Sequence, residues 1–266
     1  MYRCVPLFAT IVILTSVLAT TPARAANPDL EAWTSGAMAT RVDRGSSEFR
    51  FNVGGGLGFG TDYHGSDNYD IHFLPLVDIE WRGAYFLSTQ RGLGLNLIRR
   101  RQTKAGPRIT RAAGRKKSLN TDLPDTIDLD PSYELGLFAE HFSGAWRFDA
   151  DIKYGLNSAG HHGVIASAGV ALGGRLSELS SLIIGGRIHY ANADYMVANY
   201  GVPSSYTPTG GLRDIAAYAS LVYSVTDQIY LSIDGRGEML MEQVTLSPIV
   251  KADAQYFVGT VLGIHF

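Results

Sequence analysis

Hydrophobic and polar residues alternate along most of the chain. In the segment 71–82, Ile71 and Phe73 occupy odd positions, whereas Asp78 and Glu80 occupy even positions. A period of two places successive side chains on opposite faces of a β-strand, so each strand has one apolar and one polar face. Ten segments carry this pattern or a weaker form of it: 48–60, 71–82, 84–98, 132–142, 145–156, 163–173, 180–191, 213–224, 228–241 and 254–266.

The connections between these segments alternate in length. Short turns are expected at Gly83, Ser143-Gly144, 174–179 and 226–227, and long loops at 62–70, 99–131, 157–162, 192–212 and 242–253. Each segment is long enough to cross a membrane as a tilted strand, which takes about 9–11 residues. Short periplasmic turns, long external loops and an even strand number are typical of bacterial barrels. We therefore predict an all-β fold, a single antiparallel transmembrane β-barrel of about ten strands with both chain ends in the periplasm; twelve strands are the alternative.

Two residues conflict with a regular pattern. Strict alternation puts Arg91 on the lipid face of 84–98, where an arginine at mid-membrane costs about 2–4 kcal/mol. Gly92 follows it, so we expect a β-bulge that resets the register; dividing 84–98 into two strands, which gives a larger barrel, is the alternative. Pro75 predicts a bulge or an unpaired amide in its strand.

A soluble β-sandwich also has alternating strands, with its charged face in water. Here Gly, Ser and Ala dilute the charge on the polar faces, which suits a crowded lumen better. Aromatic residues of the apolar faces gather near the proposed periplasmic ends, as in an interfacial girdle: Phe51, Trp81, Tyr85, Trp146, Tyr223 and Phe266. These features favour the membrane barrel.

The first 25 residues have a different pattern. Arg3 precedes an apolar run, Val5–Leu18, and Ala23-Arg24-Ala25 then provides small residues for a signal peptidase, so cleavage is expected before Ala26. The only cysteine is lost with this segment, which excludes disulfides, cysteine-ligated metals and thiol catalysis from the mature protein. The predicted domains are a signal peptide (1–25), a flexible periplasmic segment (26–47) and the barrel (48–266).

The last strand ends in phenylalanine, with apolar residues at alternate positions. This resembles the signal that the barrel assembly machinery recognises in outer-membrane proteins. The residues of this assembly signal are Tyr256, Val258, Leu262, Ile264 and Phe266.

Basic residues cluster in the longest predicted loop, between positions 99 and 117, where no acidic residue occurs. They are Arg99, Arg100, Arg101, Lys104, Arg108, Arg111, Arg115, Lys116 and Lys117. Clustered basic side chains attract phosphate, so binding of outer-leaflet lipopolysaccharide is one interpretation. A solvated loop, partly neutralised by nearby aspartates, is the interpretation we favour. Nucleic acid is not an expected partner of an exported membrane protein.

The polar strand faces carry charges of both signs. They are Asp78, Glu80, Arg147, Asp149, Asp151, Lys153, Arg187, Asp234, Arg236 and Glu238. These residues can line a narrow selective pore. However, a barrel of about ten strands is nearer in size to side-chain-filled eight-stranded barrels than to open porins of about 16–18 strands. We therefore expect paired charges that fill the lumen.

His161 and His162, near Asp151 on the preceding strand, suggest a hydrolase site at the barrel rim. A nucleophilic site needs a base that a third group orients, and adjacent histidines point to opposite sides of an extended chain. We predict no enzyme activity, no metal ligands and no cofactor; a rim hydrolase is a distant alternative.

Several loop motifs resemble, in order, those of the MipA/OmpV family of outer-membrane proteins. The segments are Asp62–Asp67, Leu74–Asp78, Arg91–Leu97, Tyr195, Tyr200–Val202, Gly210-Gly211 and Ser247–Val250. The loop residues that carry the resemblance are Tyr63, Gly65, Asp67, Tyr195, Tyr200, Gly201, Val202, Ser247 and Pro248. The chain departs from the family in reading Asn199-Tyr200-Gly201-Val202 where Tyr-Phe-Gly-Val is usual, and in its long basic stretch.

The resemblance implies a non-enzymatic protein of the cell outer membrane. The family's named member is regarded as a scaffold that links a lytic transglycosylase to a murein synthase, so these enzymes are expected partners besides lipid and lipopolysaccharide. Other members are described as osmotic-response or permeability proteins, which makes a narrow channel the alternative. We expect the motif tyrosines to pack loop against loop, and the Gly and Pro residues to shape the loop backbone; a partner-binding surface is the alternative role.

Overall fold

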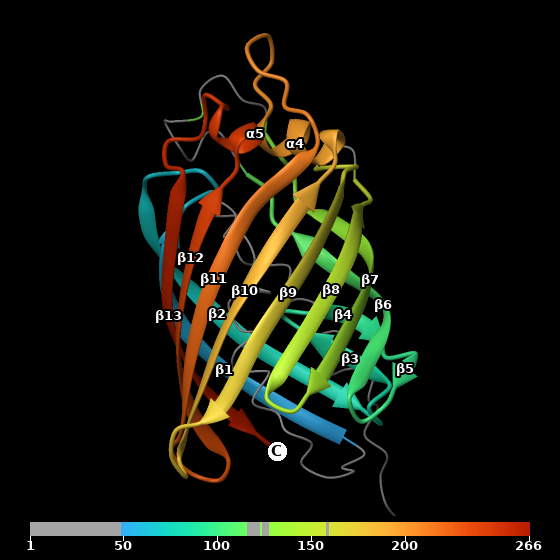
Figure 1. Ribbon diagram of the computed structural model, residues 1–266, viewed down its shortest axis with the longest axis vertical. Helices are drawn as coiled ribbons and strands as arrows, with labels where there is room; N and C mark the ends of the chain where they lie inside the picture. The colour runs from blue at the N-terminus through green and yellow to red at the C-terminus, as the bar shows by residue number, and fades with distance from the viewer. Residues whose placement is uncertain (1–48, 116–122, 124–127, 158–159) are drawn as a thin grey trace, which may run out of the picture.

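The computed structural model describes residues 49–115, 123, 128–157 and 160–266 (Figure 1). The predicted signal peptide and the segment 26–47 lie outside the described residues. The strands are β1 (Phe49–Thr61), β2 (Tyr69–Trp81), β3 (Tyr85–Ser88), β4 (Gly92–Leu95), β5 (Ile98–Arg99), β6 (Thr103–Ala112), β7 (Ser132–Ser143), β8 (Trp146–Gly155), β9 (Val164–Arg175), β10 (Ser180–Ala191), β11 (Gly211–Ser224), β12 (Ile229–Leu240) and β13 (Ala254–His265). The helices are α4 (Ala193–Tyr200) and α5 (Glu242–Thr245).

The strands form a closed antiparallel barrel. Neighbours pair in chain order, β1 pairs with β13, and β4 pairs with β6. The closed ring therefore contains twelve strands, with β5 outside it. β7 pairs with one edge of β6. The other edge pairs with β4 toward the end of β6 (Leu93↔Ile109) and with β5 toward its start (Ile98↔Ala105). The register of the β5–β6 pairs differs by one residue from that of the β4–β6 pairs. Twelve strands, the alternative from the sequence, is correct, and ten is wrong.

The segment 84–98 is not one bulged strand. β3 and β4 form a short hairpin in which Arg91 turns into the lumen, where its Nη2 lies 2.9 Å from Asp78 Oδ1 and its guanidinium lies over the Phe86 ring. This arrangement avoids the cost of a lipid-facing arginine. Gly92, which follows, has a φ of 78°.

The predicted loop 99–131 contains strand β6, so this prediction is also wrong. Lys104, Ala105, Gly106 and Pro107 are residues that strands generally disfavour, and they hide the alternation. The pattern is nevertheless present, since Arg108 and Thr110 are buried and Ile109 is exposed.

The two ends of the barrel differ. At one end, here called the turn end, strands are joined by 82–84, 100–102, 144–145, 176–179 and 225–228, and the chain leaves β13 there (Figure 1). At the other, the loop end, lie 62–68, the described residues of the β6–β7 connection (113–115, 123 and 128–131), those of the β8–β9 connection (156–157 and 160–163), 192–210 with α4, and 241–253 with α5 (Figure 1). Placement of the turn end in the periplasm and of the loop end outside the cell remains a prediction.

The outer face of the wall is apolar. Phe73, Tyr133 and Leu137 are each at least 60% exposed, whereas the alternate residues on the same strands face the lumen and are mostly buried. Such a belt is typical of a wall in contact with lipid. At the turn end, aromatic residues of the predicted girdle pack on one another: Phe51 on Phe266 and Trp81 on Tyr85. In the part of the chain that the structure describes, helices long and apolar enough to cross a membrane are absent.

Aromatic rings pack closely against glycines along the inner wall. The ring of Phe257 covers Gly58 and Gly60, and that of Tyr230 covers Gly263, so closely that a Cβ on any of the three would lie 2.3–2.7 Å from a ring atom. The rings join Leu74, Leu76, Val222 and Val261 in one buried cluster. The glycines diluting the polar strand faces therefore make room for large inward side chains.

Pro75 lies where β2 has no strand partner on one edge among the described residues. The N–H and C=O of Val77 meet Thr89 on the β3 side, and β2–β3 pairing extends no further than Asp78↔Ser88. Backbone groups two residues apart point to the same edge, so the missing N–H of Pro75 faces this unpaired edge. This agrees with the unpaired amide expected from the sequence.

Alanine substitutions at two glycines with positive φ, Gly92 and Gly144, test how closely β4 approaches β6 after the turn that contains Arg91. A Cβ on Gly92 would lie 2.0 Å from the carbonyl oxygen of Ile109, whereas one on Gly144 (φ 59°) would meet nothing within 4 Å. We expect Gly144→Ala to cost only the left-handed backbone penalty, about 1–2 kcal/mol. Gly92→Ala should cost more, because β4 must move away from β6. Urea unfolding of the protein in lipid vesicles measures both; equal losses would contradict the close approach of the two strands.

Candidate functional site

Charged side chains meet across the middle of the lumen. Arg187 on β10 reaches over β9 to Asp149 on β8, with Nη1 2.5 Å from Oδ2, and also contacts Asp151. The register puts Gly169 of β9 between Arg187 and Asp149, so no side chain blocks the contact. From the other side, Arg108 on β6 reaches over β7 to Asp151, at 3.4 Å. Two carboxylates thus share cations from three different strands, Arg147 being the third.

A second group of charges lies nearer the turn end. Glu80 accepts hydrogen bonds from Arg50 at 2.6 Å and from Lys104 at 3.0 Å, and Asp78 accepts one from Arg91. Asp78 and Glu80 were predicted as lumen charges, but their partners Arg91 and Lys104 were placed elsewhere from the sequence. Both partners were missed because the strand boundaries between 84 and 112 were wrong.

A third group lies on β12. Ser232 donates to Asp234 at 2.6 Å, and Arg236 donates to Glu238 at 2.5 Å. All ten predicted lumen charges therefore face the interior, each with a polar partner.

The histidines do not form the hydrolase arrangement considered above. His161 is buried, with Nε2 3.2 Å from Glu134 Oε1, and Lys153 lies 3.5 Å from the other oxygen of Glu134. Asp151 is instead held by Arg187, Arg108 and Ser167, and His162 is exposed. Glu134, missed from the sequence, has the inward alternation of β7 as its only signal.

The lumen is closely filled at these levels. Nine of the ten predicted lumen charges are 9% exposed or less, and the side chain of Asp149 is 7% exposed. A cavity of about 40 Å³ lies among Gln90, Arg91, Arg108, Phe138 and Arg187. This volume holds a few water molecules.

The family-motif residues come together at the loop end as a cap over the barrel. Tyr63 donates to the Ile249 carbonyl at 2.8 Å, and Ser247 donates to the Tyr200 carbonyl at 2.6 Å. Tyr63, Val202 and Ile249 form one buried cluster, and Tyr200 belongs to a second. Burial raises the pKa of the Tyr200 hydroxyl well above its usual value.

The other family-motif residues lie outside these two buried clusters of the cap. Tyr195 accepts a hydrogen bond from Arg213 and packs edge-on against His161. A Cβ on Gly201, directly after α4, would lie 2.4 Å from the Val197 carbonyl oxygen, and one on Gly65 would lie 2.8 Å from Val250. Asp67 and Pro248 are exposed. Loop-against-loop packing is thus observed for Tyr63 and Tyr200, while a role in partner binding remains a prediction.

The basic stretch does not form one patch. Arg99, Arg100 and Arg101 are exposed at the turn end, Lys104 and Arg108 enter the lumen, and Arg111 is exposed on the outer face. At the loop end, Arg115 is buried and donates to the Asn199 carbonyl at 2.7 Å, and burial lowers the pKa of its guanidinium. Lys116 and Lys117 lie outside the described residues.

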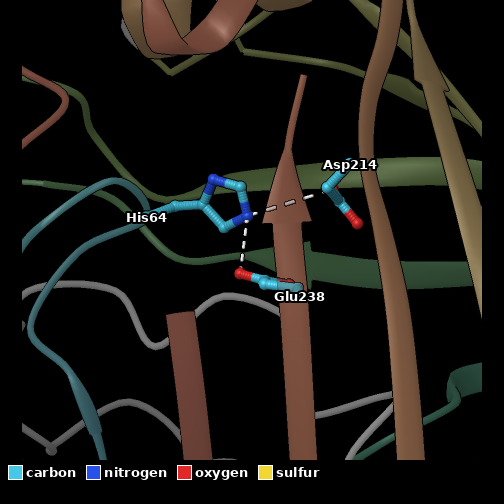
Figure 2. A group of neighbouring side chains, drawn as sticks. All are labelled: His64, Asp214 and Glu238. Atoms are coloured by element: carbon cyan, nitrogen blue, oxygen red, sulfur yellow. Dashed lines mark ion pairs between the residues drawn. The ribbon is translucent and has the colours of Figure 1, made fainter. Parts of the chain in front are cut away.

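Three residues beneath the cap have side chains suited to hold a metal ion. The ligand atoms of His64, Asp214 and Glu238 lie within 4.8 Å of one another (Figure 2). The sequence predicted no metal ligands. Glu238 was noted only as a lumen charge, and the signal for His64 was its position inside the Asp62–Asp67 motif.

Removing the central lumen cation tests the charge network. Arg187→Met leaves Asp149 and Asp151 buried with fewer cations, and we expect a loss of about 3–5 kcal/mol in the free energy of unfolding. Arg175→Met, which replaces an exposed arginine of β9, should change it by less than about 0.5 kcal/mol. Urea unfolding in vesicles gives both values. Similar small effects for the two variants would show that the lumen charges are solvated rather than paired.

Comparison with known proteins identifies the family. The model of the MipA family, described as MltA-interacting protein MipA, matches residues 53–266. No curated protein matches the sequence.

Solved structures with similar folds are membrane barrels of low identity. The NanC porin has a TM-score of 0.47 and 11% identity, over 79% of this chain and 98% of that one. An outer membrane channel from Pseudomonas putida F1 has a TM-score of 0.45 and 12% identity, over 85% and 98%. OmpT of Vibrio cholerae has a TM-score of 0.37 and 9% identity, over 82% and 97%. At these scores the likeness says nothing about activity or ligand. The family match and the closed barrel with its apolar belt assign the chain: it belongs to the MipA family of outer-membrane β-barrel proteins.

Proposed function

We propose that this protein is a non-conducting, non-enzymatic scaffold that holds murein-remodelling enzymes at the periplasmic side of the outer membrane. The expected partners are a lytic transglycosylase and a murein synthase. The description of the family, which names an interaction with MltA, supports the first of these. The observation that carries the proposal is the filled lumen.

A channel for solutes needs a continuous aqueous path, so the side chains that line it are accessible to water. Here Asp78, Glu80, Asp151 and Arg187 are each no more than 8% exposed, and each carboxylate has a cationic partner. The loops over the mouth are also packed on one another. These features favour binding at a surface over passage through the barrel.

The turn end offers a surface for such binding. Residues 97–102, here called the basic arm, include β5 outside the closed ring and the turn to β6. In this arm Arg99, Arg100 and Arg101 are exposed next to exposed Leu97 and Ile98. Beside it, Arg82 lies over the Trp81 ring and accepts a hydrogen bond from Arg99 at its carbonyl. Exposed arginine and aromatic side chains are frequent in protein interfaces. The positive charge of the arginines fits an acidic surface on the partner.

Single-channel recording distinguishes a scaffold from the alternative, a narrow channel. In planar bilayers we expect the folded protein to show no conductance steps, and the Asp149→Asn/Asp151→Asn variant to be equally silent. Heat-modifiable migration on SDS gels confirms that both are folded. Discrete steps whose size or ion preference changes in the variant would favour the channel and overturn the scaffold.

Binding to a lytic transglycosylase tests the basic arm. We expect Arg100→Glu/Arg101→Glu to weaken binding at least about tenfold, because each reversal replaces attraction to an acidic surface with repulsion. The matched control reverses two exposed charges away from the turn end, Arg111→Glu/Lys251→Glu, and should bind like the wild type. Surface plasmon resonance with the barrel in nanodiscs measures all three. Equal loss in both variants would indicate a nonspecific charge effect and contradict docking at the arm.

A further inference from the structure

Two carboxylates face each other beneath the cap because of strand register. Asp214 lies on β11 and Glu238 on β12, with Ala216 opposite Glu238 and Leu240 opposite Asp214. The two residues are therefore diagonal neighbours on the inward face of the sheet. Their side chains are 0% and 5% exposed.

A loop turn brings His64 over these carboxylates. The turn is closed by a hydrogen bond from the Ser66 N–H to the Tyr63 carbonyl, with Gly65 at a φ of 107°. The β12–β13 loop holds this turn in place, because the Lys251 N–H donates to the Gly65 carbonyl at 2.7 Å. The imidazole is fixed at its other nitrogen by the Tyr200 hydroxyl, 2.6 Å from Nδ1.

The free nitrogen of His64 is directed at both carboxylates. Nε2 lies 3.0 Å from Glu238 Oε1 and 3.9 Å from Asp214 Oδ2, and the ring edge is turned toward the two groups (Figure 2). This nitrogen is buried and, apart from these two contacts, makes no hydrogen bond with the described residues. If Nδ1 carries the proton and donates to Tyr200, the lone pair of Nε2 points between two anionic oxygens.

Basic side chains also contact the two carboxylates, including Asp214 Oδ2, the oxygen that faces His64. His189 contacts Asp214 Oδ1 at 2.7 Å, Arg213 contacts Asp214 Oδ2 at 2.5 Å, and Arg236 contacts Glu238 Oε2 at 2.5 Å. These contacts fix both carboxyl groups and leave Glu238 Oε1 facing His64. They also neutralise charge, so an added cation would be held less tightly than by bare carboxylates.

We propose that His64, Asp214 and Glu238 form a site for a divalent metal ion, and that the ion is of the Zn²⁺ type. One imidazole and two carboxylates suit such an ion. Tetrahedral ligands at about 2.0–2.2 Å from Zn²⁺ lie about 3.3–3.6 Å apart, and the two distances from His64 bracket this range. The Tyr200 hydroxyl supplies the second hydrogen bond that orients a metal-bound histidine. A bound ion would tie the β1–β2 loop to β11 and β12, and thereby fasten the cap to the wall.

Zinc titration of the purified, folded protein tests the site. We expect calorimetry to give one Zn²⁺ per chain, and Zn²⁺ to raise the thermal unfolding temperature. His64→Ala and the nearly isosteric Glu238→Gln should each weaken binding at least about tenfold, whereas His162→Ala, which removes an exposed histidine of another loop, should bind like the wild type. Binding should also weaken at acidic pH, because protons compete for the histidine.

The alternative is that a protonated His64 bridges the two carboxylates without a metal. In that case the wild type binds no stoichiometric Zn²⁺, and Zn²⁺ leaves its thermal unfolding temperature unchanged. Either that result or unchanged Zn²⁺ binding in a folded His64→Ala or Glu238→Gln variant overturns the proposal. Near-ultraviolet circular dichroism establishes folding of each variant, and Glu238→Gln decides the matter if His64→Ala does not fold.

Discussion

The hydrogen-bonding needs of the backbone within lipid impose the constraint on which this structure depends. A membrane core offers no partner to an amide, so a sheet that crosses it has to close on itself. In this chain the closure is made at β1–β13 and β4–β6. The β4–β6 closure is made through a short β3–β4 hairpin, and β3 covers only part of β2. Among the described residues, the rest of that edge of β2, toward the loop end, has no strand partner. Along that edge, the Ile71 N–H bonds to Asp70, Pro75 has no N–H, and the Val77 N–H bonds to Thr89. Two of the donors on this edge thus bond to nearby side chains, and a proline stands in place of a third.

Closure also determines what the interior has to contain. A ring of twelve strands encloses more space than small inward residues can fill, and glycines on the wall widen it further. Long side chains occupy this space. Phe257 and Tyr230 lie over glycines on one side, and Arg187 reaches across a neighbouring strand on the other. Because an arginine that crosses the lumen is far from water, it needs carboxylates such as Asp149 and Asp151 within reach. The mixture of charges is therefore a packing solution, and this explains why a barrel of this size has a filled centre.

Much of this architecture is visible in the sequence, and the part that is not has a physical cause. Nine of the ten predicted segments correspond to single strands within about two residues, because one face of each meets lipid and the alternation is strong. The strand boundaries between 84 and 112 were predicted wrongly because Arg91 is in a turn, and because Gly106 and Pro107 hide the alternation of β6 in the sequence although the strand is continuous. Pairing partners were not predictable at all. Contacts such as Arg108–Asp151 depend on register across an intervening strand, which a single sequence does not specify. The motif loops were found, but the proximity of His64 to Glu238 requires the folded barrel.

The division of the basic stretch shows how topology assigns roles to adjacent residues. Arg101 and Lys104 are three positions apart, yet the first is exposed beyond the rim and the second pairs with Glu80 in the lumen. A local count of charge would treat them as one patch for phosphate. The fold instead leaves three consecutive arginines at the turn end and directs the next two basic residues inward, where they neutralise carboxylates. The residues that fill the barrel are thereby separate from those exposed at its rim. Since the lumen and the cap are held by their own contacts, the turn end can change its surface charge to suit a partner without disturbing the barrel. The two ends can accordingly carry independent functions on one rigid wall.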